Sequence, residues 1–279
     1  MSLKDVLMQD ERHLPANRKE LFFDKLFVRF GFFLKMGISL FLFCLPYFIL
    51  MVIKDIFFIY MGDIVPEQEI DAFARSYGFL FDLGGVVLLV PAALGLAGTF
   101  RIIRQFAWGN GCFFVSDFKT GIRTNGKFFS VFGIMTGIFL TLNNLNLLAS
   151  TETSVSALTL MPVFLAVLFL IPVMLLCFAQ ITVYNTTLAG SLRDCIWLYG
   201  RTLPKTLPAA LVMELPLLLV FISVPHTKYE ATVVFAIVIL PVMLFGWFLY
   251  CCGVFDKYIN AKSYPELVDK GLFKEKQRY

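Results

Sequence analysis

The stretch DFKTGIRTNGKFFS, residues 117–130, comes closest of any in this sequence to a phosphate-binding motif. Gly121 is followed after four residues by Gly126 and Lys127, which matches the first part of the GxxxxGK[ST] phosphate loop. That loop also needs a preceding strand, a cradle of backbone N–H groups and a hydroxyl for magnesium. Phe128 occupies the hydroxyl position, and long apolar runs lie on both sides. We therefore predict no nucleotide site, and we interpret Lys127 as a side chain that snorkels to a membrane interface.

No other arrangement of side chains indicates catalysis or metal binding. The two histidines, His13 and His226, have no partner at the spacing of a metal site or a catalytic triad. The adjacent Cys251 and Cys252 also lack the spacing of metal ligands. We expect a protein that is not an enzyme and that binds no cofactor, no metal and no nucleic acid.

Glu214, in the segment LVMELPLLL, is the ionisable residue placed deepest in an apolar run. An ionisable group in mid-membrane is costly and is by default a functional hypothesis. Two interpretations stay open: a protonated carboxyl that hydrogen-bonds between helices, and a substrate or proton site. Asp82 lies near the end of an apolar run, so we expect it to reach interfacial water. Three amides could line an outward-facing vestibule or join neighbouring helices: Asn143, Asn144 and Asn146.

The composition places these residues in a membrane protein. Of the 279 residues, 58% are hydrophobic and 16% are charged, and the mean hydropathy is +0.78. Soluble domains are about 45–50% apolar and about 25% charged. Because a bilayer-spanning helix needs roughly 20 apolar residues, the apolar runs predict an all-α, polytopic helical bundle. Its six expected spans are 36–60, 79–100, 128–148, 157–183, 206–224 and 232–253.

Lys and Arg residues are concentrated in alternate segments between these spans. Of the 24 basic residues, seven lie in residues 1–35, five in 101–127, three in 184–205 and six in the tail after residue 256. Positively charged loops remain in the cytoplasm, so we predict a multi-pass protein of the cell membrane with both termini cytoplasmic. We expect three parts. Residues 1–35 form an N-terminal segment with an interfacial helix, residues 36–255 form the transmembrane domain, and residues 256–279 form a cytoplasmic tail.

A weak internal repeat relates two of the basic connectors. A shift of 78 residues aligns FKTGIRTNGKFFSVFGIM with IWLYGRTLPKTLPAALVM, so that Arg123 meets Arg201 and Lys127 meets Lys205. Each connector follows one expected span and leads into another. We interpret the chain as a duplicated hairpin, with units at about 79–148 and 157–224.

Each connector has the pattern of an amphipathic helix lying along the membrane. In the first, Phe114, Phe118 and Ile122 recur every fourth residue, and Cys195 and Tyr199 belong to a similar stripe in the second. GIRTNGK is then the expected turn between the first of these helices and the next span, and ELFFDKLFVRFGFFLK predicts a third interfacial helix. The connector helices could grip lipid headgroups or dock a protein. The candidate contact residues are Asp117, Phe118, Arg123, Lys127, Arg193, Arg201 and Lys205.

Several short motifs follow one another along the chain. The first motif is FFDKLFVRFGFFLKMGISLFLFCLP, near the N-terminus. The second is PAALGLAGTFRIIRQFAWGNGCFFVSDFKTGIRTNGK, which contains Pro91-Ala92, Asp117-Phe118 and Asn125-x-Lys127. LRDCIWLYGRTLPKTL and GVFDKYI come later. In these motifs the chain resembles the YesL-like family of bacterial integral membrane proteins, although ITVYNTTLAG departs from the family pattern. The resemblance implies an accessory component of a carbohydrate ABC importer and supplies no catalytic residue.

Two functions follow as hypotheses. The first is a non-catalytic accessory or regulatory protein that contacts the permease or ATPase subunits of a sugar ABC importer through its connector helices. The alternative is a secondary transporter or channel-like protein with Glu214 at mid-membrane. An ABC permease is disfavoured because the second connector lacks the Glu-Ala-Ala element of that coupling loop.

Overall fold

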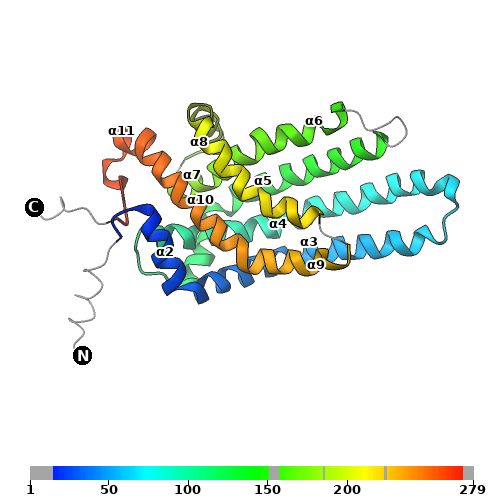
Figure 1. The fold of residues 1–279 in the computed structure, drawn as a ribbon, viewed down its shortest axis with the longest axis horizontal. Helices are drawn as coiled ribbons and strands as arrows, with labels where there is room; N and C mark the ends of the chain where they lie inside the picture. Colours follow the sequence, from blue (N-terminus) through cyan, green and yellow to red (C-terminus); the bar gives the residue numbers. More distant parts are fainter. Residues whose placement is uncertain (1–14, 151–156, 185, 223–224, 273–279) are drawn as a thin grey trace, which may run out of the picture.

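The computed structural model describes residues 15–150, 157–184, 186–222 and 225–272, which form an elongated all-helical bundle (Figure 1). The helices are α2 (Arg18–Val28), α3 (Phe30–Gly62), α4 (Ile70–Ala107), α5 (Phe114–Ser150), α6 (Ala157–Leu165), α7 (Ile171–Val183), α8 (Leu188–Ile222), α9 (Pro225–Val234), α10 (Leu240–Phe255) and α11 (Ala261–Ser263). Three π-helical segments are η2 (Ala166–Leu170), η3 (Phe235–Ile239) and η4 (Asp256–Asn260) within the described ranges. Two 3₁₀ turns are η1 (Glu67–Glu69) and η5 (Pro265–Leu267).

The predicted class, a polytopic helical membrane protein, agrees with the length and composition of these helices. Five stretches of the described residues are long and apolar enough to cross a bilayer: Phe30–Gly62, Ala72–Ala107, Phe114–Asn146, Thr159–Val183 and Tyr229–Ser263. Each overlaps one expected span. The remaining expected span, 206–224, falls in α8, and its last residues, 223–224, lie outside the described part of the chain.

The connectors are not separate short helices, and GIRTNGK is not a turn. The first connector and the span that follows it form the single helix α5, and the second connector is likewise continuous with α8. A Cβ on Gly121 would lie 2.6 Å from Arg101 Cβ, and one on Gly126 would lie 2.7 Å from Leu94 Cδ2. Both glycines therefore allow α5 to approach α4 closely, which offsets their cost of about 1 kcal/mol each in a helix interior.

The apolar stripes of the connectors face the bundle interior. Phe118 is 8% exposed. The centroid of its ring lies 5.4 Å from the centroid of the Phe43 ring, and the Phe118 ring packs over Gly98. Cys195 and Tyr199 are buried in the same core. The prediction that Phe118 contacts headgroups or a partner is therefore wrong. An amphipathic pattern identifies an apolar face, but it does not distinguish a lipid neighbour from a neighbouring helix.

The N-terminal amphipathic segment divides into two helices. α2 ends at Val28, and the backbone at Arg29 leaves the helical region before α3 begins at Phe30. α2 then packs on α10, where the rings of Phe22 and Phe245 stack with centroids 5.9 Å apart. Residues 30–35, expected in an interfacial helix, are thus the first turns of the first spanning helix.

The span from α6 to α7 contains the π-helical segment η2 just before Pro172. Ile171 N–H reaches five residues back to Ala166 O, and Pro172 has no N–H to give to Leu168 O, four residues earlier. The Tyr199 hydroxyl of α8 donates to that carbonyl instead. A side chain from a neighbouring helix thus satisfies a backbone group that would otherwise be unpaired in the membrane.

The same arrangement recurs in the last span, where η3 precedes Pro241. The carbonyl four residues before this proline belongs to Ile237 and points at α3. A Cβ on Gly37 would lie only 1.8 Å from Ile237 O. Gly37 is therefore the point at which the backbones of α3 and η3 meet.

Two contacts join residues that are 78 positions apart. Arg104 Nη1 donates to Thr182 O at 2.6 Å, and the rings of Phe100 and Phe178 lie 5.8 Å apart between centroids. This separation equals the shift of the sequence repeat.

Candidate functional site at the basic end

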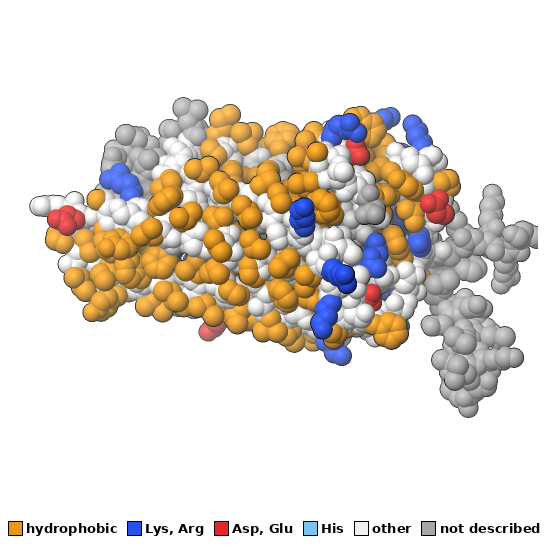
Figure 2. Space-filling model, turned by 180° about the vertical axis from the view of Figure 1, so that it is seen from behind, with side chains coloured by type: hydrophobic (Ala, Val, Ile, Leu, Met, Phe, Trp, Pro, Cys, Tyr) orange, Lys and Arg blue, Asp and Glu red, His pale blue; other side chains and the backbone are white. Residues whose placement is uncertain are grey.

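One end of the bundle carries α2, α11 and the first turns of α5 and α8, and we call it the basic end (Figure 1). Figure 2 shows Lys and Arg side chains gathered toward this end, whereas hydrophobic side chains cover the rest of that face. The basic end also holds the densest set of polar contacts between segments far apart in sequence. The candidate site therefore lies at this end.

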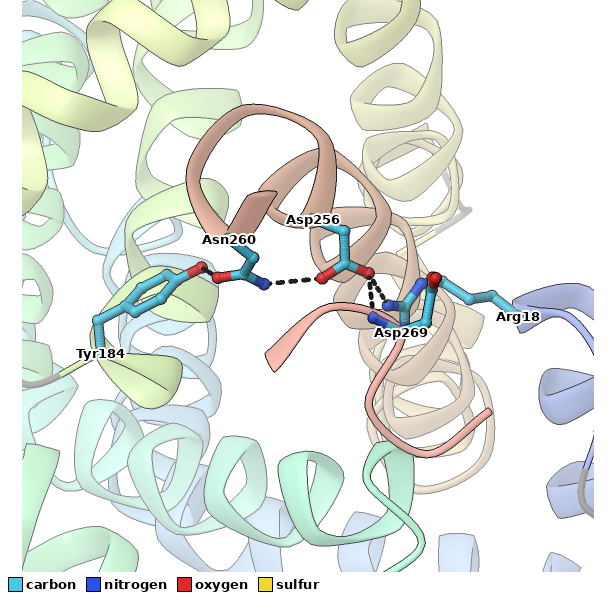
Figure 3. Close-up of polar contacts among 5 residues, drawn as sticks. All are labelled: Arg18, Tyr184, Asp256, Asn260 and Asp269. Carbon is cyan, nitrogen blue, oxygen red and sulfur yellow. Dashed lines mark hydrogen bonds and ion pairs between the residues drawn. The ribbon is translucent and has the colours of Figure 1, made fainter. Parts of the chain in front are cut away.

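Asp256, at the start of η4, is the centre of this set (Figure 3). Arg18 of α2 donates through Nη2 to Asp256 Oδ2 and forms an ion pair with it. The backbone N–H of Asp269 donates to the same oxygen at 3.2 Å, and Asn260 Nδ2 donates to Oδ1 at 2.7 Å. One carboxylate thus connects the N-terminal helix, the end of the last span and the following tail.

Tyr184 extends the network to the end of α7. Its hydroxyl donates to Asn260 Oδ1 at 2.5 Å, so the Asn260 amide is held on both sides. Burial raises the pKa of the Tyr184 hydroxyl well above its ordinary value, and therefore the group remains a donor over the physiological pH range.

The tail after η5 lies on the end of α4. Gly271 has a φ of +87°, and a Cβ there would lie 2.1 Å from Ala107 O. Lys270 Nζ lies 4.2 Å from the centroid of the Trp108 ring, which Arg104 also covers at 4.8 Å. A positive-φ glycine and a cation–π pair thus hold the tail against the bundle.

A cavity of about 610 Å³ lies beside this network, between α2, α8 and α10. Its lining includes five cationic side chains, the rings of Phe22, Tyr250 and Tyr258, and two glycines of α10. Two of its lining residues, Thr202 and Tyr250, are linked through the buried Thr206 behind them by hydroxyl contacts of 2.7 and 2.8 Å. Its volume is that of a typical small-molecule site.

The cationic contact candidates of both connectors point outward. Arg123 and Lys127 are exposed on α5, and three more are exposed on α8: Arg193, Arg201 and Lys205. Asp117 plays a local role, because its carboxylate accepts the Phe113 N–H at 2.8 Å at the start of α5. Phe118 is in the core, as described above.

Asp82 forms a second polar cluster with Lys54 and one of the three amides, Asn144, away from the basic end. Asp82 is 7% exposed, forms an ion pair with Lys54 at 2.5 Å and accepts from Asn144 Nδ2 at 3.1 Å. Asp82 is therefore largely enclosed by the protein, with Lys54 of α3 on one of its oxygens, and its contact with interfacial water stays a prediction. A cavity of about 20 Å³, room for about one water, adjoins this pair.

The other two amides differ from each other. Asn146 Nδ2 donates to Thr159 O of α6 at 3.0 Å, which joins two helices. Asn143 Oδ1 is buried and has no hydrogen-bond partner within the described residues. Two of the three amides thus make contacts between helices.

Glu214 is 4% exposed on α8, and neither carboxyl oxygen has a hydrogen-bond partner among the described residues. It belongs neither to the Asp82 cluster nor to the basic end. The structure therefore does not bring the predicted polar candidates together in one site.

Sequence reasoning missed the residues at the centre of the basic end. Arg18 and Asp256 are 238 residues apart, and no spacing rule predicts such a contact. Asp256 and Asn260 are one helical turn apart, a pattern that indicates a shared face. Their partners, Tyr184 and the Asp269 N–H, become visible only when the helix ends are assembled.

Comparisons of the chain with protein-family models, curated proteins and solved structures find no match. The resemblance to the YesL-like family therefore stays a prediction.

Proposed function

We propose that this chain is a non-catalytic accessory protein of a carbohydrate ABC importer, and that it contacts importer subunits through the two connector segments of α5 and α8. The chain itself is a polytopic helical membrane protein. The observation that carries the proposal is the exposure of cations at equivalent positions of both connectors, Arg123 with Arg201 and Lys127 with Lys205. The importer as partner rests on the sequence resemblance.

The burial of the connector stripes supports a protein partner. The buried stripes leave cations on the outward face of each connector, beside exposed apolar side chains such as Val115 and Trp197. A face of this composition can meet a protein surface that combines acidic and apolar groups. Charged surfaces of this kind set specificity and association rate more than total affinity.

Affinity purification from the native host in mild detergent tests the proposal. The wild-type chain is expected to recover the permease and ATPase subunits of an importer, identified by mass spectrometry. Arg123→Glu should reduce their recovery several-fold, whereas Lys262→Glu, an equally exposed cation of α11, should not. Recovery of no importer subunit with the wild-type chain, or an equal loss in both variants, would contradict the proposal.

A secondary transporter is the second candidate, and it is favoured by the buried Glu214 carboxyl, which has no hydrogen-bond partner among the described residues. A buried carboxyl without a partner can accept and release a proton during transport. Proton flux into proteoliposomes, followed with a pH-sensitive dye, should then disappear in Glu214→Gln. Flux that persists unchanged in this variant would remove Glu214 from any pathway.

A further inference from the structure

The cavity at the basic end combines a cationic rim with an apolar floor. Its rim is formed by side chains from α2, α8 and η4, which meet only in the folded bundle. The five cations are Arg18, Lys19, Arg201, Lys205 and Lys257. No carboxylate belongs to the lining.

Most of this positive charge has no ion-pair partner in the part of the chain that the structure describes. Arg18 is paired with Asp256, but its Nη1 is buried and has no partner within the described residues. The other four rim cations form no ion pair within the described ranges. Like charges so close together repel each other, and a bound anion would relieve this repulsion.

Aromatic rings hold part of the rim in place. The Arg201 guanidinium lies 5.1 Å from the Trp197 ring centroid and 5.5 Å from that of Tyr258. Lys257 Nζ lies 5.4 Å from the same Tyr258 ring. Because these contacts restrict the side chains before a ligand arrives, the site loses less conformational entropy on binding.

The floor of the cavity is hydrocarbon. Phe22, Leu249 and Val254 line it, together with two glycines of α10 whose missing side chains leave room. A Cβ on Gly246 would lie 3.3 Å from the Phe22 ring, and one on Gly253 would lie 3.8 Å from Arg18. A free inorganic anion has no use for such a floor, whereas an acyl chain does.

We propose that this cavity binds an anionic phospholipid, with the phosphate among the rim cations and an acyl chain along the floor of Phe22, Leu249 and Val254. Basic pockets between spanning helices on the cytoplasmic side bind the headgroups of anionic lipids. Thr202 and Tyr250, which also line the cavity, add neutral hydroxyl groups to its wall. This inference does not depend on the importer, since it concerns the purified chain alone.

Native mass spectrometry of delipidated protein in detergent tests it, with phosphatidylglycerol and phosphatidylcholine as probes. Phosphatidylglycerol is expected to bind about tenfold or more tightly than phosphatidylcholine. The triple variant Arg201→Gln, Lys205→Gln, Lys257→Gln should lose this preference. The matched control, Lys119→Gln, Arg123→Gln, Arg193→Gln, removes three exposed cations outside the cavity and should keep it.

Two competition measurements distinguish binding of a lipid from binding of a free phosphate. Inorganic phosphate and glycerol 3-phosphate, which carry no acyl chain, should not displace phosphatidylglycerol at millimolar concentration. Displacement by either would overturn the lipid assignment, and so would equal binding of the two lipids or equal loss in both triple variants. Circular dichroism and the elution volume of each variant show that it is folded.

Discussion

At the scale of single residues, Asp256 carries the most consequential contacts of the basic end. Its two carboxylate oxygens accept from Arg18, Asn260 and the Asp269 backbone, so that three segments share one charge. The Arg18 and Asp256 side chains are 17% and 11% exposed. A pair that is this protected from water leaves an uncompensated charge when one partner is removed.

Asp256→Asn is therefore expected to destabilise the fold. The loss should be about 1–3 kcal/mol, between the values for exposed and fully buried pairs, measured by thermal unfolding in detergent. Asp194→Asn provides the control, because the Arg193–Asp194 pair is 3.5 Å apart with side chains 84% and 45% exposed. An equal shift of the two unfolding midpoints would show that Asp256 does not organise this end.

At the scale of helices, prolines in two spans decide how neighbouring helices meet. Pro172 and Pro241 each follow a π-helical segment and leave the carbonyl four residues earlier without its usual donor. The first of these carbonyls is capped by Tyr199, and the second is packed against Gly37. A local irregularity thus becomes a point of contact between helices.

Gly37→Ala should weaken the contact of α3 with η3. Because the new Cβ would lie 1.8 Å from Ile237 O, one backbone must move, at a cost of about 1–3 kcal/mol. Gly31→Ala, in the same helix with no atom within 4 Å of the new Cβ, should be neutral or stabilising by up to about 1 kcal/mol. Thermal unfolding in detergent compares them, and a Gly37→Ala variant as stable as Gly31→Ala would refute the contact.

At the scale of the whole molecule, the bundle has chemically different ends. The basic end holds exposed cations, the Asp256 network and the cavity, whereas the opposite part holds the Lys54–Asp82–Asn144 cluster. Since positive charge is retained in the cytoplasm, this asymmetry predicts one orientation for the entire chain.

Reporter fusions check that orientation. Green fluorescent protein fused after Tyr279 should fluoresce, and alkaline phosphatase at the same position should be inactive, because the tail is expected in the cytoplasm. Alkaline phosphatase inserted in the turn between α3 and α4, after Asp63, should be active. The reverse pattern at both positions would invert the predicted topology.

The sequence was sufficient for the helical membrane class and for the positions of most spans. Runs of apolar residues extend over more than a bilayer thickness, and a helix is the local structure that satisfies its own backbone there. The same local pattern put Arg123 off the apolar stripe of its connector, and Arg123 is exposed. It did not show that α5 is continuous, because glycine is read locally as a turn signal even where it permits close packing.

Only the tertiary structure decided which surfaces meet. The stripe containing Phe118 could have faced lipid or protein, and the position of α4 put it in the core. Asp82 and its partner Lys54 lie on different helices, so no local pattern predicts their ion pair. Arg18 pairs with Asp256 and also lines one cavity with Arg201 and Lys257, because residues of α2, α8 and η4 that are far apart in sequence surround the same space. Hydrophobicity along the chain determines that helices span the membrane. Contacts between residues far apart in sequence determine where charged side chains, a cavity and apolar side chains occur together.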